Sequence, residues 1–192
     1  MNRNLYNDFL VTFQCCFGTL DMRIDMKDIV IRKVNPSDSR EKISNVYEQS
    51  WKFAYKGIIP QEYLDSIPRG QWCGALDNSD RHNLVMLDGD KIIGTSSYCK
   101  SRFEDYENWG EIISIYFLPE YMGKGYGKCL LEQAVKELKA MGFKKVFLWV
   151  LEVNHRARHF YEKCGFKNSG EYMYNVIGGK QLCELQYVYF ID

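Results

Sequence analysis

The sequence predicts a mixed α/β fold, in which a central sheet carries helices on its faces. The order of predicted elements is strand, helices, three strands, helix, strand, helix and two strands. The chain has 192 residues, which is long enough to bury one substantial core. No internal repeat and no linker interrupts residues 26–192, so we expect them to form a single domain.

The first part of this domain is predicted to hold one strand and two helices. Residues 29–34 are apolar and rich in β-branched side chains, which favours a strand. Residues 40–52 place apolar side chains on one side of a helix, and a shorter helix is predicted over residues 63–67. Gly57 and Pro60 separate the two helices.

A hairpin and a third strand follow. Residues 84–87 and 91–99 flank Asp88-Gly89-Asp90, which is a turn signal between two apolar runs. Residues 110–118, GEIISIYFL, form the next predicted strand. The helix predicted over residues 129–141 presents one apolar stripe and ends at Gly142.

The last part of the chain is predicted to hold three strands and one helix. The run VFLWVL is apolar throughout, which suits a strand covered on both faces. Gly165 ends the last helix, and Gly178-Gly179 separates the final two strands. In chain order these elements cover residues 146–151, 154–163, 171–176 and 182–190.

Composition limits the partners and the compartment. Basic and acidic residues both number 25, so the net charge gives no reason to expect nucleic acid or an anionic membrane as partner. None of the 7 cysteines is spaced as in a zinc site, and we expect a reducing, cytoplasmic location. His155 and His159 lie four apart but have no evident third ligand, so no metal is predicted.

Residues 1–25 fit the rest of the sequence poorly and are expected to be an N-terminal extension. They could be an added arm, a partner-binding segment or a misassigned start. Residues 9–20, FLVTFQCCFGTL, contain Gln14 and have no clear small-residue cleavage site, so a signal peptide is not predicted.

The stretch YMGKGYGKCLL places three glycines at every second position before a helix. A strand, glycines and a helix start together form a general device for binding phosphate, because the first amides of a helix are unpaired. The spacing fits neither a nucleotide P-loop, since Cys129 follows Lys128, nor a dinucleotide fingerprint, whose last glycine would fall on Lys128.

The segments PEYMGKGYGKCLL and VFLWVLEVNHRARHFYEKCGF together resemble the GNAT superfamily of N-acetyltransferases. The resemblance implies a mostly antiparallel sheet and acetyl-CoA as cosubstrate, with the pyrophosphate on the backbone amides of the glycine loop. The side chain of Met122 departs from the family pattern, which has Gln or Arg at its position. The loop residues implied are Met122, Gly123, Lys124, Gly125, Tyr126, Gly127 and Lys128.

The resemblance also implies catalytic residues and further cofactor contacts. Glu111, at the start of the strand before the loop, matches in placement the general base of family members that use a glutamate. Tyr161 matches the tyrosine that protonates the leaving thiolate. Asn154 would contact the pantetheine arm as well as cap its helix. Backbone of Tyr116, Phe117 and Leu118 would contact the cofactor where two strands splay apart.

The resemblance implies a primary amine as acceptor, on a small molecule or a protein. The acceptor groove would be formed by residues 51–72, which are rich in aromatic side chains, and residues 177–181. A homodimer is possible in this family. A second interpretation is a catalytically silent acyl-CoA-binding or regulatory module on the same fold, which Met122 keeps open.

Overall fold

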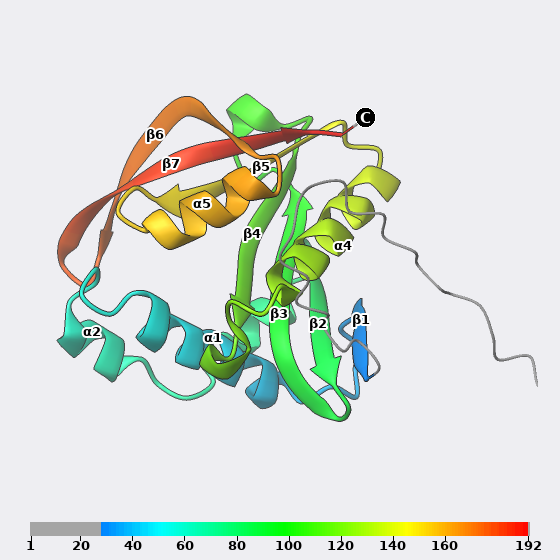
Figure 1. The fold of residues 1–192 in the computed structure, drawn as a ribbon, viewed down its shortest axis with the longest axis vertical. Helices are drawn as coiled ribbons and strands as arrows, with labels where there is room; N and C mark the ends of the chain where they lie inside the picture. Colours follow the sequence, from blue (N-terminus) through cyan, green and yellow to red (C-terminus); the bar gives the residue numbers. More distant parts are fainter. Residues whose placement is uncertain (1–27, 192) are drawn as a thin grey trace, which may run out of the picture.

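The computed structural model describes residues 28–191, so the extension expected over residues 1–25 lies outside the described part. A seven-stranded sheet runs through the molecule in the order β1-β2-β3-β4-β5-β7-β6 (Figure 1). The strands are β1 (Ile29–Lys33), β2 (His82–Asp88), β3 (Lys91–Lys100), β4 (Gly110–Phe117), β5 (Lys145–Leu151), β6 (Lys167–Ile177) and β7 (Lys180–Phe190).

Every neighbouring pair of strands is antiparallel except β4 and β5, which run parallel. This confirms the mixed, mostly antiparallel sheet. The chain leaves β4, forms a helix and returns as β5, which is the crossover that a parallel pair requires.

Five α-helices and two 3₁₀ turns occur in residues 28–191. Ser39 caps the first helix, where its side chain accepts a hydrogen bond from the amide of Lys42 at 3.3 Å. The helices are α1 (Arg40–Ala54), α2 (Gln61–Ser66), α3 (Cys73–Leu76), α4 (Tyr126–Ala140) and α5 (His155–Lys163), and the turns are η1 (Glu104–Tyr106) and η2 (Pro119–Tyr121).

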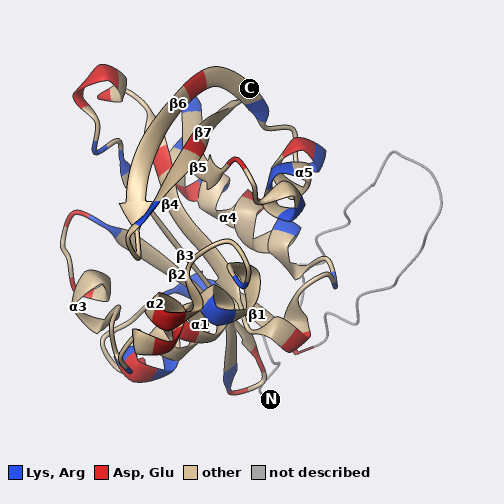
Figure 2. Ribbon diagram, turned by 90° about the vertical axis from the view of Figure 1, so that its left-hand side faces the viewer, with Lys and Arg blue, Asp and Glu red and all other residues tan. Residues whose placement is uncertain are grey.

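Helices cover both faces of the sheet. Leu84 of β2 belongs to the core under α4 and α5, whereas its neighbour Val85 belongs to the core under α1 and α3. This alternation is the period of two expected of a strand that is covered on both sides. A smaller core joins α2 to β5 and β7 through Leu64, Leu151 and Leu182. In the view of Figure 2, basic and acidic residues are interspersed over the elements.

The structure differs from the prediction mainly at element boundaries. Helix α4 begins at Tyr126, three residues before the predicted start, because Gly125 takes a left-handed φ of 88° and ends the loop there. Strand β6 begins at Lys167 rather than at residue 171. The single-turn helix α3 was not predicted, since four residues are too few to show a helical period.

No helix in the described range is long and apolar enough to cross a membrane.

Candidate active site

Strands β4 and β5 separate soon after they meet. Their parallel ladder contains only two pairs, Gly110 with Val146 and Glu111 with Phe147. Beyond this point β4 stays paired with β3 as far as Phe117, and β5 stays paired with β7 as far as Leu151. Each strand therefore presents one unpaired backbone edge to the other, as the splay expected near residues 116–118 requires.

A β-bulge lies at the start of the splay. Ser97 of β3 pairs with Ser114, while the next residue, Tyr98, pairs with Ile112, so Ile113 has no partner on β3. The extra residue increases the local twist of β4. It therefore helps to turn this strand away from β5.

The register decides which backbone groups of β4 face the open edge. The carbonyl of Ser114 accepts a hydrogen bond from the side chain of Ser96 at 2.9 Å, and the amide of Leu118 donates to the carbonyl of Ile93 at 2.9 Å. Both groups point toward β3. Since backbone groups alternate along a strand, those of Ile115 and Phe117 point toward the open edge instead. Of the three residues predicted to offer backbone groups to the cofactor, only Phe117 faces the open edge. The backbone of Tyr116 and the amide of Leu118 point toward β3 instead, because they pair with that strand. Ile115, which was not predicted, also faces the open edge.

The glycine loop leaves several amides without acceptors. Gly123 and Gly125 have positive φ angles of 78° and 88°, which glycine adopts without strain. The amide of Met122 donates to Pro119 at 3.2 Å and that of Lys128 to Gly125 at 3.1 Å. Between them, the amides of residues 123–127 have no acceptor within the described chain. They lie at the start of α4, where the helix dipole favours an anion.

Gly127 has a packing role that the sequence did not reveal. A Cβ atom at this position would lie 3.3 Å from two ring carbons of Phe160 on α5. The missing side chain therefore lets the first turn of α4 approach α5 closely. This glycine brings the two helices together, whereas Gly123 and Gly125 shape the loop.

Two lysines add positive charge beside the loop. Lys124 lies over the ring of Tyr121, with its Nζ 5.4 Å from the ring centroid. Lys128 forms an exposed i,i+4 pair with Glu132 at 3.7 Å, which contributes little to stability. Both side chains are long, exposed and close to the open amides.

Glu111 is buried beneath the segment that joins β3 to β4. Its side chain is 1 % exposed, and Arg102 binds both carboxylate oxygens, with Nη2–Oε1 at 2.5 Å and Nε–Oε2 at 3.0 Å. The backbone amide of Arg102 adds a third hydrogen bond at 3.1 Å. A carboxylate has about four acceptor positions, so one remains open. Arg102 was missed because nothing in the sequence pairs it with Glu111.

Tyr161 is buried on α5, among the rings of Phe160, Phe166 and Tyr187. Its hydroxyl has no hydrogen-bond partner among residues 28–191. Burial raises the pKa of Tyr161, with a smaller contribution from Tyr116, so the phenol stays protonated at neutral pH.

More tyrosine hydroxyls gather on the α1 side of β4. Tyr55 and Tyr116 approach each other with their oxygens 3.3 Å apart, and Tyr47 bonds to Ser114 at 3.0 Å. Burial raises the pKa of Tyr55 to about 12, and it also raises the pKa of Tyr116 well above its usual range. These phenols are neutral hydrogen-bonding groups. Tyr47 lies on α1, Tyr55 directly after it and Tyr116 on β4, so sequence spacing could not reveal the cluster.

Asn154 caps α5 as predicted. Its Oδ1 accepts a hydrogen bond from the amide of Ala157 at 3.1 Å. The Nδ2 group has no recorded partner in the described range, and it lies just beyond the end of β5, next to the open edge. The cap therefore uses only Oδ1 of the side-chain amide, and the Nδ2 group can donate a hydrogen bond to a ligand.

The hairpin of β6 and β7 reaches α2, as expected of an acceptor groove. The Nζ of Lys180 donates to the carbonyl of Ile58 at 2.7 Å, and a Cβ atom at Gly178 would lie 2.7 Å from Tyr63. The two segments named in the sequence, residues 51–72 and 177–181, are thus in contact.

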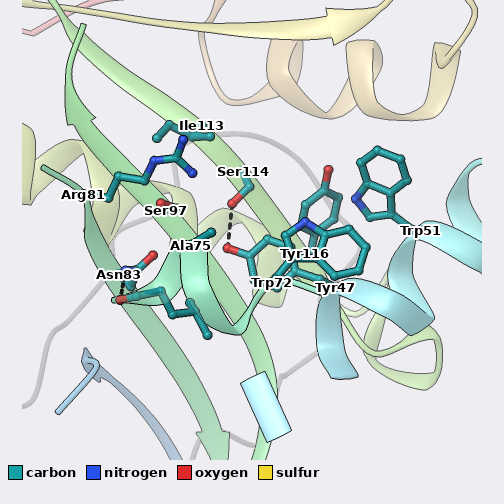
Figure 3. A pocket seen from close by; sticks show the side chains of 11 residues that line it. Tyr47, Trp51, Trp72, Ala75, Arg81, Asn83, Ser97, Ile113, Ser114 and Tyr116 are labelled. Atoms are coloured by element: carbon teal, nitrogen blue, oxygen red, sulfur yellow. Dashed lines mark hydrogen bonds between the residues drawn. The ribbon is translucent and has the colours of Figure 1, made fainter. Parts of the chain in front are cut away.

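A pocket of about 160 Å³ lies on the same side of the sheet as α1 (Figure 3). Its walls come from α1, α3, the start of β2, the second half of β3, and the bulged part of β4. The pocket lies next to the splay, because its lining includes Ile113, Ser114 and Tyr116 of β4. The glycine loop, in contrast, opens beside α4 and α5.

Comparisons with known proteins agree on one family. The model of the acetyltransferase (GNAT) family matches residues 42–166. The spermidine N(1)-acetyltransferase of Thermoplasma acidophilum is 32% identical over 146 residues, covering 72% of this chain and 88% of the relative. An uncharacterized N-acetyltransferase of Archaeoglobus fulgidus is 42% identical over 134 residues, covering 68% and 88%. The crystal structure of the PaiA N-acetyltransferase of Thermoplasma acidophilum with coenzyme A superposes with a TM-score of 0.65, at 28% identity, covering 84% of this chain and 99% of that one.

Proposed function

The chain belongs to the acetyltransferase (GNAT) family, and on this basis we propose that it moves the acetyl group of acetyl-CoA to a primary amine at the splay between β4 and β5. Acetyl-CoA is the cosubstrate. The observation that carries the proposal is the pairing of an open strand edge with a row of free amides at the start of α4. The edge suits the amide-rich pantetheine arm, and the loop suits the pyrophosphate.

The cofactor is proposed to bind mainly through backbone. Ile115 and Phe117 offer their backbone groups to pantetheine from β4, and the amides of residues 123–127 bind the pyrophosphate. Asn154 donates its Nδ2 group from the other side of the opening. Lys124 and Lys128 add charge-assisted contacts to phosphate. Because the donors are backbone amides, Met122 in place of Gln or Arg leaves the binding surface intact.

The reaction is proposed as direct attack. The acceptor nitrogen, once it has lost a proton, forms a bond to the thioester carbonyl carbon, and the C–S bond then breaks. Glu111 accepts that proton through its remaining acceptor position, and Arg102 fixes the orientation of the carboxylate.

Tyr161 is proposed to assist the leaving group. Its neutral phenol passes a proton to the sulfur as the C–S bond breaks, so the thiol of coenzyme A is the second product, and the phenol is restored by the second proton that the acylated nitrogen releases. A phenol with a raised pKa stays protonated throughout the neutral range, so it remains a donor. The backbone donors of β4 at the splay stabilise the carbonyl oxygen.

The test is thiol release from acetyl-CoA by the purified chain across a panel of small amines, amino acids, peptides and polyamines. Amine-dependent release, with the acetylated amine identified by mass spectrometry, supports the proposal. Tight binding of acetyl-CoA without transfer to any amine would favour the silent acyl-CoA-binding module instead. No binding and no release would contradict both.

A further inference from the structure

The pocket beside the splay contains one charged side chain, and that charge has no partner. Arg81, directly before β2, is partly buried and forms no side-chain hydrogen bond or ion pair with any described residue. In Figure 3 its guanidinium extends along the sheet toward Ile113. An arginine held in a pocket without a counter-ion is suited to receive an anionic group from a ligand.

A second polar group in the pocket also lacks a partner. Ser97 of β3 is 4% exposed, and its hydroxyl makes no hydrogen bond in the described structure. A buried hydroxyl left unpaired is costly, and a ligand oxygen would satisfy it. Ser97 lines the same pocket as Arg81 and lies at the bulge opposite Ser114.

The remaining lining provides shape and neutral polarity. Tyr47 and Trp72 stack with their centroids 5.5 Å apart and form an aromatic wall. Asn83 is buried, and its amide donates to the carbonyl of Leu76 at 3.3 Å. No Asp or Glu lines the pocket. A volume of about 160 Å³ corresponds to roughly five waters, enough for a carboxylate with a few carbons.

Carboxylates do lie near the splay, but outside this pocket. Glu111 is held by Arg102, and Glu184 of β7 accepts a hydrogen bond from Asn175 at 2.6 Å. Glu184 also contributes to the raised pKa of Tyr55, which places its charge on the β7 side of the cluster. The charge of Glu111 is balanced by Arg102, so the negative charge of Glu184 on the β7 side and the positive charge of Arg81 in the pocket lie on different sides of the splay.

We propose that Arg81 and Ser97 bind a carboxylate of the acceptor, so the favoured substrates are amines that carry a carboxylate, such as free amino acids. This rests on the proposed acetyl transfer at the splay. The amine would lie at the opening between β4 and β5, while the carboxylate enters the pocket past Ile113 and Ser114. A polyamine would bring positive charge to an unpaired arginine, which is unfavourable.

The test compares acids with their neutral amides. The values of kcat/KM are measured for a series of ω-amino acids that starts with glycine, β-alanine and γ-aminobutyrate, for the matched amides, and for spermidine. For at least one chain length, the wild type is expected to prefer the acid by about 10-fold or more, the usual effect of a charge-assisted hydrogen bond.

The variant Arg81→Gln should lose this preference while its kcat/KM for the amides stays unchanged, which shows that the protein remains folded and active. Ser97→Ala should reduce the preference in part. Lys136→Gln, which removes an exposed positive charge on α4 outside this pocket and outside the predicted acceptor groove, is the control and should behave as the wild type.

A preference for amides or for spermidine, or an acid preference that persists in Arg81→Gln, would overturn the assignment of the pocket and leave the acetyltransferase proposal standing. If the wild type acetylates no amine although it binds acetyl-CoA, the proposed transfer fails and this inference fails with it.

Discussion

Glu111 pairs with Phe147 at the last rung that β4 and β5 share. The groups proposed for the active site lie around the opening that begins there. The free amides of the glycine loop, the open edge of β4 and the phenol of Tyr161 border it. The carboxylate of Glu111 lies at its closed end, held by Arg102.

Replacing Glu111 by Gln should lower kcat by about 100-fold and leave the affinity for acetyl-CoA unchanged. The amide has nearly the same shape but cannot take a proton. Steady-state kinetics and a calorimetric titration of the variant measure the two quantities.

Arg102→Gln is the companion variant, since it keeps the carboxylate and removes only its anchor. It should lower kcat less than Glu111→Gln does. A Glu111→Gln variant with normal kcat and a lowered Tm would show that Glu111 only ties down the segment between β3 and β4.

Replacing Tyr161 by Phe should lower kcat by about 10- to 100-fold with little change in Tm. The hydroxyl has no hydrogen-bond partner in the described structure, so its loss leaves no protein group unsatisfied. Turnover and a thermal melt give the two readouts, and Tyr172→Phe, at a tyrosine that is 61% exposed, is the control. A normal kcat in Tyr161→Phe would contradict its role at the sulfur.

Met122→Gln, which restores the usual family residue, should change the Kd for acetyl-CoA by less than about threefold. The amide of Met122 already donates to Pro119, and its side chain packs against the core under α4. Isothermal titration measures the change. A gain of more than about tenfold would mean that the side chain at this position, rather than the loop amides, limits binding.

The buried phenols predict a loss of stability at alkaline pH. Burial raises the pKa of Tyr55 to about 12, above the value of about 10 expected in the unfolded chain. The neutral phenol therefore stabilises the fold fully below about pH 10, and this contribution is lost as the pH rises toward 12.

The variant Tyr55→Phe cannot titrate. Across that window, the unfolding free energy of the wild type should therefore fall relative to that of Tyr55→Phe by about 1.4 kcal/mol per pH unit. Denaturant unfolding at several pH values measures it, with Tyr172→Phe as control. A constant difference from pH 8 to about 12 would show that Tyr55 titrates normally.

Much of the fold was readable from the sequence because glycines mark its boundaries. Gly142 and Gly165 end helices with φ angles of 95° and 88°, and Gly178 and Gly179 form the last turn with φ angles of 59° and 79°. Apolar runs between such markers gave each strand. The starts of α4 and β6 were misplaced because periodicity weakens at the ends of elements.

The site was predictable only in part. The glycine loop, Asn154 and Tyr161 lie in local motifs, so a single sequence is enough to propose them as site residues. The bulge at Ile113, the outward backbone of Ile115 and the ion pair between Arg102 and Glu111 depend on the strand register. Register is set by pairing between distant segments, which a single sequence does not specify. The unpaired charge of Arg81 became visible only when its surroundings were known.

The proposed role of the loop amides is tested most directly by the binding of acetyl-CoA to Gly125→Val, compared with Gly142→Val in isothermal titration. Both glycines have left-handed φ angles, 88° and 95°, at opposite ends of α4, so valine strains the backbone similarly in each. A thermal melt confirms that each variant is folded, and ATP and NAD serve as ligand controls.

Wild type and Gly142→Val are expected to bind acetyl-CoA alike, in preference to both controls, whereas Gly125→Val is expected to lose binding. A folded Gly125→Val protein that binds acetyl-CoA as the wild type does would contradict the role assigned to the loop amides.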